Sequence, residues 1–283
     1  MSATLDVTKT EADRLWAERF WTRAYRPDVP ATIDDELVQW ASVADLFAAD
    51  AHKYADRVGF VSMGSGVTYG RTLSEARAFA AELQAKGVQP GDRVALMMPN
   101  CLQYPVALFG VLFAGAVVVN VNPLYTPREL RHQLKDSGAV AIVAMEMFAA
   151  TLEQALEGTD VRHVIVTAMG DMMGRVKGTA ITALLRHVEK LVPKWRIAQA
   201  ERWPAVMRRA RRLTLKTVET KPEDLAFLQY TGGTSGVAKG AMLTHRNIIA
   251  NVLQGRAWIM AQIPQDQVAV SYTHLTLPTK RIV

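Results

Sequence analysis

Short apolar runs alternate with amphipathic segments through much of this 283-residue chain, and that alternation constrains its fold most. The runs are continuous rather than polar at every second position, as is typical of parallel strands buried on both faces. We therefore predict an α/β fold with a mostly parallel sheet flanked by helices. The predicted strands are 58–63, 67–69, 93–98, 117–121, 140–145, 163–167 and 225–229, and the predicted helices are 72–86, 103–114, 128–136, 148–156 and 245–260.

Cap and turn residues set the expected boundaries of these elements. The first two strands form a hairpin around residues 64–66, and Thr72 caps the helix that follows. Thr126 and Pro127 are a cap and first-turn pair for the helix at 128. Thr244 is the expected N-cap of the last helix.

A glycine-rich loop at 231–240 follows the strand at 225–229 and leads into that last helix. It holds four glycines, the hydroxyls of Thr231, Thr234 and Ser235, and one lysine, Lys239. Glycine lets backbone N–H groups converge on an anion, while hydroxyls and an ammonium group suit phosphate oxygens. In a parallel sheet, ligands bind at the carboxyl ends of strands, where this loop begins. The pattern predicts a polyphosphate site, with ATP as its ligand.

The spacing of the loop excludes two common phosphate-binding motifs. A Walker loop needs Gly-Lys-Ser/Thr running into the helix, whereas Lys239 stands between Ala238 and Gly240. The dinucleotide pattern G-x-G-x-x-G does not occur in the loop either. The alternative reading is a glycine-rich surface linker.

The loop closely resembles the phosphate loop of the adenylate-forming, or AMP-forming acyl-CoA synthetase, superfamily. That loop usually reads T-S-G-T-T-G-x-P-K-G; here Gly232 replaces the serine, Ser235 the second threonine and Ala238 the proline. The continuation AMLTHRN and the blocks GDRVALMMPNCLQ at 91–103 and FAGAVVVNVNPLYTPRELRHQL at 113–134 also resemble the family. The sequences of these blocks are most similar to those of bacterial long-chain fatty-acyl-CoA synthetases. The resemblance runs from about residue 20 to about residue 263.

The resemblance implies a ligase reaction in two steps. The carboxylate of a long-chain fatty acid attacks the α-phosphate of ATP, and the thiol of coenzyme A then displaces AMP from the acyl-adenylate. The implied cofactors are ATP with Mg²⁺ and coenzyme A, and no residue of the chain is assigned as a metal ligand. Lys239 and Thr234 take the implied catalytic roles on the phosphates. The implied nucleotide-binding residues are Thr231, Gly232, Gly233, Thr234, Ser235, Gly236, Lys239 and Gly240.

Segments that the family carries beyond its phosphate loop do not occur in this sequence. They include the aromatic–histidine pair of the acyl pocket, the adenine and ribose segments, and a C-terminal domain with a catalytic lysine. We therefore expect an incomplete N-terminal part of the adenylate-forming large domain, which does not complete the reaction alone. The expected organisation is a helical or extended N-terminal segment 1–45, a partial AMP-binding domain 46–270 with a basic insertion 168–221, and a non-native tail 271–283.

The basic charge of the chain is concentrated in residues 186–221. Eleven Lys or Arg stand against three acids there, a net charge of +8, so that the rest of the chain contributes −2 to the total of +6. Arg208, Arg209, Arg211 and Arg212 together with Met207 predict a basic amphipathic helix. One reading is a solvated insertion; the other is an anionic membrane surface. No nucleic-acid recognition module accompanies the charges, so we do not expect nucleic acid as a partner.

Several features favour a cytoplasmic enzyme, with the inner face of the membrane as its peripheral docking site. Cys101 is the one cysteine, which rules out an internal disulfide, and we expect it to be a buried, unreactive residue. The apolar run 105–119 is shorter than the roughly 20 residues of a spanning helix and predicts a buried helix leading into a buried strand. The sequence predicts no oligomeric state and no acyl chain length.

We expect other polar residues near the motifs to have structural rather than catalytic roles. We expect His245 to be a packing residue and Arg128 with Glu129 to serve their helix start. Asn120 and Asn122 stand at a strand exit and are expected to shape the wall of the site. Two alternative functions remain: a ligase for another carboxylic acid, and a non-enzymatic basic protein that docks on membranes.

Overall fold

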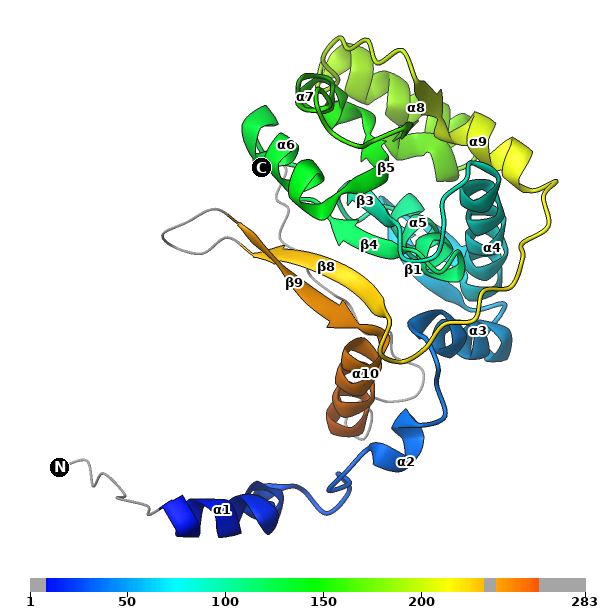
Figure 1. Cartoon of the computed structure of the whole chain (residues 1–283). Coiled ribbons are helices and arrows are strands. Elements are labelled where there is room, and N and C mark those ends of the chain that lie inside the picture. Colours follow the sequence, from blue (N-terminus) through cyan, green and yellow to red (C-terminus); the bar gives the residue numbers. More distant parts are fainter. Residues whose placement is uncertain (1–8, 232–237, 260–283) are drawn as a thin grey trace, which may run out of the picture. The chain divides into compact units, whose positions relative to one another are not determined.

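The computed structural model of the chain describes residues 9–231 and 238–259 (Figure 1). The described residues divide into two compact units, residues 9–39 with 250–259 and residues 40–231 with 238–249. Within the described residues, the second unit holds a seven-stranded sheet in the order β7-β6-β5-β3-β4-β8-β9. Every pair is parallel except β8 with β9. The strands are β3 (Arg93–Met97), β4 (Val117–Asn120), β5 (Ala139–Met145), β6 (His163–Thr167), β7 (Ala200–Arg202), β8 (Leu225–Thr231) and β9 (Lys239–Thr244).

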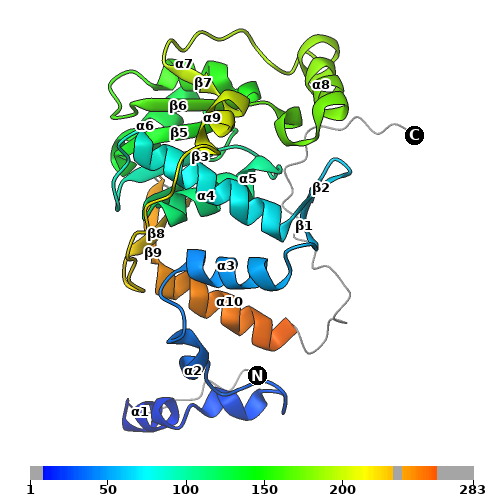
Figure 2. The ribbon, with the colours of Figure 1, turned by 90° about the vertical axis from the view of Figure 1, so that its right-hand side faces the viewer.

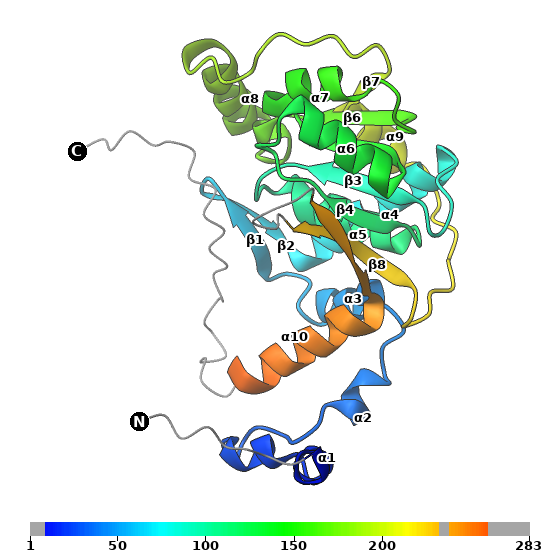
Figure 3. The same cartoon turned by 60° about the vertical axis from the view of Figure 1, so that its left-hand side comes forward.

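Helices cover both faces of this sheet, which confirms the predicted α/β class. Helices α6 and α7 lie on one face, in front of the sheet in Figure 3, and α4, α5 and α9 lie on the other, toward the viewer in Figure 2. A separate hairpin joins β1 (Val58–Ser62) to β2 (Ser65–Thr68). The helices of this unit are α3 (Val43–Lys53), α4 (Tyr69–Ala85), α5 (Gln103–Phe113), α6 (Pro127–Ser137), α7 (Ala149–Ala155), α8 (Arg175–Ala183) and α9 (Trp203–Ala210), with short turns η2 (Glu146–Phe148), η3 (Met169–Met172) and η4 (Leu184–Val188).

The strand and helix signals of the sequence act as expected in most of this unit. All seven residues of β5 are buried, because helices cover the sheet on both sides. Helix α6 begins with a capping box: Glu129 N–H donates to the Thr126 hydroxyl while Glu129 accepts from Thr126 N–H. It ends at Gly138 in the left-handed conformation. Arg128 and Glu129 therefore start a helix, as predicted.

Two predicted boundaries were wrong by a few residues. Helix α4 begins at Tyr69 and is capped by Thr68, whereas Thr72 is buried in its first turn and donates to the Thr68 carbonyl. Both threonines can cap, and the chain uses the one that directly leaves a strand. The β1–β2 hairpin turns at Met63 and Gly64, both with positive φ, rather than around residues 64–66.

The sequence predicted no strand between the glycine-rich loop at 231–240 and the last helix, but residues Lys239–Thr244 form strand β9. This strand pairs antiparallel with β8 from Leu225↔Thr244 to Thr231↔Lys239. Its side chains are exposed or half-buried, so the sequence lacks the apolar pattern of a strand. The loop consequently joins two strands, and helix α10 (His245–Ile259) follows β9 with Thr244 as its cap, as predicted.

The first unit combines α1 (Lys9–Ala17), η1 (Phe20–Ala24) and α2 (Asp34–Leu37) with the second half of α10. Arg26 donates to the Trp258 carbonyl at 3.1 Å, and the rings of Tyr25 and Trp258 meet edge to face at 5.1 Å. Arg256 pairs with Glu36 at 2.6 Å. These contacts hold residues 25–36 against the end of α10.

The apolar run 105–119 forms most of α5 and β4, as predicted. Among the described helices, none combines the length and the apolar character needed to cross a bilayer. Cys101 is buried, and burial raises the pKa of its thiol to about 11. The thiol is therefore protonated at neutral pH, which agrees with the expectation of an unreactive cysteine.

His245, at the first position of α10, fastens that helix to α3. Its side chain is buried, and Nδ1 accepts from the Val43 N–H at 3.1 Å. Ser42 caps the same end of α3, so His245 satisfies another of its free N–H groups. Burial lowers the pKa of His245, which keeps the ring neutral and able to accept. This geometry supports the packing role expected from the sequence.

The His245 contact predicts a pH-dependent contribution to stability. Because the folded pKa is lowered, the contribution is complete above the ordinary value of 6.5 and is lost as pH falls from 6.5 to the folded pKa. In urea unfolding, the difference between the parent and His245→Gln should be largest above that pH and shrink below it. His187→Gln, at an exposed site, is the control. A difference that stays constant with pH would contradict the assignment.

Candidate functional site

The β8–β9 hairpin brings two predicted binding residues face to face. Thr231 ends β8, Lys239 begins β9, and the two are direct cross-strand partners with exposed side chains. A hydroxyl and an ammonium group therefore stand on opposite sides of the loop that joins these strands. Gly240 follows one pair further into the hairpin. Five other predicted residues lie outside the described residues: Gly232, Gly233, Thr234, Ser235 and Gly236.

Tyr230 joins the end of this hairpin to helix α6. Its ring lies against its cross-strand partner Gly240, where an added Cβ would meet ring atoms at 3.0 Å. Its hydroxyl donates to Asp136 Oδ2, in the last turn of α6, at 2.5 Å. Burial and the Asp136 carboxylate both raise the pKa of Tyr230, so the hydroxyl remains a donor. Glycine at 240 thus makes room for the ring that ties the hairpin to α6.

A polar network lies beside the hairpin where β4 ends. The Asn120 amide donates to Gln229 Oε1 at 3.0 Å, and the two residues are register partners in the parallel β4–β8 pair. The Tyr104 hydroxyl of α5 donates to Asn120 Oδ1 at 2.9 Å, and Gln133 of α6 donates to the Asn120 carbonyl at 2.8 Å. Asn120 therefore links both helix layers to β8, two residues before Thr231.

One acceptor in this network has no partner. Gln133 is 1% exposed, and within the described part of the chain its Oε1 accepts no hydrogen bond. A buried acceptor left unsatisfied costs roughly 1–3 kcal/mol.

Sequence reasoning found part of this site and missed part of it. Asn120 was expected to shape its wall; the structure shows its amide bonded to Gln229, and its place in the wall of a ligand site stays a prediction. Gln229 carried a usable signal, since it is a lone polar residue within an apolar strand. Asp136 and Gln133 carried none, because each sits on an ordinary amphipathic helix far from the loop in sequence.

The basic segment 168–221 is built into the second unit. Strand β7 pairs with β6, and α9 buries Trp203, Val206, Met207 and Ala210 at 2% exposure or less. The Trp203 ring packs against Phe79 of α4 at 5.1 Å. The amphipathic helix predicted around Arg208–Arg212 therefore turns its apolar side into the protein. That face is not available for insertion into a bilayer.

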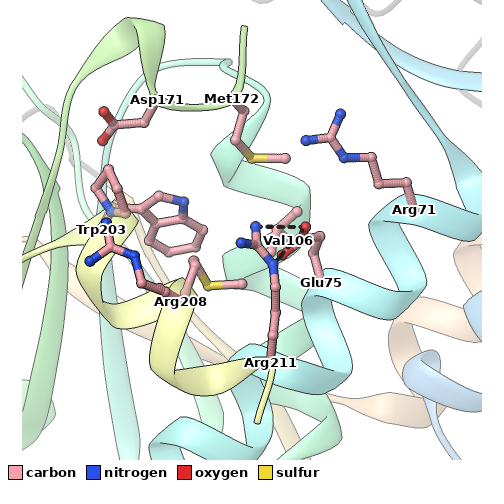
Figure 4. Close-up of a pocket in the computed structure, with 10 residues that line it drawn as sticks. Arg71, Glu75, Val106, Asp171, Met172, Trp203, Arg208 and Arg211 are labelled. Carbon is pink, nitrogen blue, oxygen red and sulfur yellow. Dashed lines mark hydrogen bonds and ion pairs between the residues drawn. The ribbon is translucent and has the colours of Figure 1, made fainter. Parts of the chain in front are cut away.

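Acidic residues from other elements pair with many of the arginines. Arg209 donates to the buried Glu82 at 3.0 Å, and Arg202 pairs with the buried Glu146 at 3.0 Å. Arg211 pairs with Glu75 at 2.8 Å, at a cavity of about 210 Å³ between α4, α9 and η3 (Figure 4). No predicted binding residue lines that cavity. The excess charge of the segment is thus partly balanced inside the fold.

Comparisons with known proteins agree with these features. Residues 47–278 match the protein family described as AMP-binding enzyme. The long-chain-fatty-acid–CoA ligase of Salmonella typhimurium is 49% identical over 267 residues, 94% of this chain and 45% of that protein. The ligase of the same name from Yersinia pestis is 52% identical over 241 residues, 85% of this chain and 42% of that protein. The chain thus spans less than half the length of these relatives.

A solved structure supports the same fold. The long-chain-fatty-acid–CoA ligase of Archaeoglobus fulgidus superposes with a TM-score of 0.58 at 27% identity, covering 77% of this chain and 39% of that one. The mostly parallel sheet flanked by helices is therefore the arrangement found in part of that enzyme.

The contact between Tyr230 and Gly240 predicts a coupling between the two positions. Gly240→Ala should lower stability by about 1–3 kcal/mol in urea unfolding, because the new methyl displaces the ring. In a Tyr230→Ala background the same substitution should cost little, since the ring is gone. Tyr230→Phe, which keeps the ring and loses the bond to Asp136, should retain the full Gly240→Ala cost. Equal costs in all three backgrounds would show that the ring does not require glycine.

Proposed function

The chain belongs to the AMP-binding enzyme family, and from that premise we propose that it carries the triphosphate-binding part of an ATP-dependent ligase for long-chain fatty acids. The reaction would pass through an acyl-adenylate and end in a thioester with coenzyme A. Because the chain spans 45% of its Salmonella relative, we do not propose that it completes both steps alone.

The observation that carries the proposal is the pairing of Thr231 with Lys239 across the hairpin. Lys239 is exposed, and no carboxylate in the described residues pairs with it. An uncompensated ammonium opposite a hydroxyl, at the ends of a glycine-rich loop, suits the β- and γ-phosphates of ATP. In the proposal, Thr234, Ser235 and the N–H groups of the loop also bind these phosphates.

Catalysis at this site would depend on positioning and charge neutralisation. Transfer at a phosphorus centre needs few covalent partners from the protein, and the main requirement is that the reacting groups are held in place. Tyr230 with Asp136, and Asn120 with Gln229, would fix the hairpin relative to the sheet. Lys239 would balance charge that builds on the leaving pyrophosphate. Mg²⁺ would supply further neutralisation when bound with ATP through the phosphate oxygens.

The proposed acid follows the names of the relatives, which are long-chain-fatty-acid–CoA ligases. A ligase for another carboxylic acid is the alternative within the family. The proposed location is the cytoplasm, where ATP and coenzyme A are available.

Replacing Lys239 tests its proposed role in binding the phosphates of ATP. Lys239→Ala should weaken binding of Mg-ATP to the chain by about 10- to 100-fold, because one charge-assisted contact with phosphate is worth roughly 1.5–3 kcal/mol. Isothermal titration with ATP and with AMP separates the phosphate term from the rest. AMP lacks the β- and γ-phosphates, so its affinity should change little.

Lys216→Ala is the matched control, because it removes the same charge at another exposed position. It should leave ATP affinity at the parent value. The proposal would be wrong if Lys239→Ala bound ATP as the parent does, or if both variants lost affinity equally.

A further inference from the structure

Helix α8 and its π-helical continuation η4 expose an apolar stripe. Val176 is 86% exposed, Leu184 45%, Val188 68% and Leu191 40%. Val176, Leu184 and Val188 follow one another at intervals of eight and four and lie on one side of the helix, and Leu191 lies just beyond its C-terminal end. Isolated exposed apolar residues are common, but four of them along one helix and its C-terminal end form a patch of the kind that marks an interaction surface.

The opposite side of this helix packs tightly against the rest of its unit. The backbones of Gly170 in η3 and Gly178 in α8 approach so closely that a Cβ on Gly170 would lie 2.0 Å from the Gly178 carbonyl oxygen. Arg186 in η4 pairs with the buried Glu146 at 2.5 Å. The outward direction of the stripe is therefore set by tight packing behind it.

Cations flank the stripe. Glu189 is the one acid in residues 175–194, which also carry five Lys or Arg. Arg186 is taken up by Glu146, and the other four are exposed and make no ion pair with a described residue: Arg175, Lys177, Lys190 and Lys194. The surface thus combines aliphatic side chains with uncompensated positive charge.

The β1–β2 hairpin extends this surface. Lys177 Nζ donates to the Met63 carbonyl at 2.7 Å, which places the hairpin turn beside α8. Met63 is 52% exposed and Val61 is 70% exposed. Figure 2 shows α8 and the hairpin projecting toward the same side of the sheet.

We propose that this surface docks on an anionic lipid bilayer. The α8 patch is defined here as Met63, Val176, Leu184, Val188 and Leu191 with the cations Arg175, Lys177, Lys190 and Lys194. A helix that lies in a membrane interface needs an apolar stripe for the acyl region and lysines or arginines for the headgroups, and the patch supplies both. Its positive charge is complementary to an acidic headgroup layer.

The α8 patch differs from the membrane contact that the sequence predicted. The sequence predicted that contact over 186–221, with a basic amphipathic helix around Arg208–Arg212. The apolar side of α9 is buried against α4, whereas the apolar side of α8 faces solvent. Docking through α8 goes beyond the proposed function and does not depend on it.

Vesicle flotation tests the proposal with the whole chain. The vesicles are phosphatidylcholine alone, or phosphatidylcholine with about 30% phosphatidylglycerol, a composition of the kind that attracts polybasic segments. The parent should float with the acidic vesicles and lose that binding in high salt. Lys190→Gln with Lys194→Gln should lower the partition coefficient about 30-fold, as expected for two basic residues near an anionic surface. Val176→Asp with Val188→Asp should lower it at least as much.

Arg208→Gln with Arg212→Gln is the matched control, since it removes two exposed charges, one in α9 and one just after it. It should retain most of the binding. Circular dichroism and ATP titration of every variant should match the parent, which separates a failure of docking from a failure of folding or of the proposed phosphate grip.

Three results would overturn the proposal. In the first, the α8 variants bind acidic vesicles as well as the parent. In the second, the α9 control loses as much binding as the lysine variant, which would indicate charge attraction without a defined surface. In the third, sedimentation shows that Val176→Asp with Val188→Asp separates a dimer while vesicle binding is unchanged, which would make the patch a contact between two copies of the chain.

Discussion

Strand β8 has two partners, and its hydrogen bonds with them determine where every described part of the candidate site lies. Parallel pairing with β4 puts the ends of both strands at one edge of the sheet, so that Gln229 meets Asn120. Antiparallel pairing with β9 returns the chain beside Thr231, so that Lys239 faces it. Tyr230 then fastens this junction to α6 through Asp136. If β8 slipped by one residue, each of these contacts would turn to the opposite face.

The parts of the fold that the sequence predicted are those in which local signals and tertiary packing agree. Strand β6 has the predicted bounds because its apolar run is bounded by polar residues, and α6 begins where Thr126 and Glu129 form a capping box. Strand β9 gave no such signal. Its side chains are exposed or half-buried, and it forms a strand by pairing with the backbone of β8. The bond between Tyr230 and Asp136 joins residues 94 positions apart, so no local pattern could reveal it.

The distribution of charge along the sequence also differs from its distribution in the fold. Counted along the chain, residues 186–221 carry a net charge of +8 and suggest one basic face. In the fold, Glu82 of α4 and Glu146 at the start of η2 are buried and pair with arginines of that segment. A buried carboxylate requires such partners, because an unpaired one would be strongly destabilising. The charges that remain exposed around α8 are fewer, and they lie beside exposed aliphatic residues.

Backbone amide shifts on addition of a non-hydrolysable ATP analogue with Mg²⁺ test the central claim most directly. If the hairpin between β8 and β9 holds the phosphates, the largest shifts will lie at Tyr230, Thr231, Lys239 and Gly240, and AMP will not reproduce them. Shifts centred on another part of the chain, with these four amides unchanged, would contradict the account.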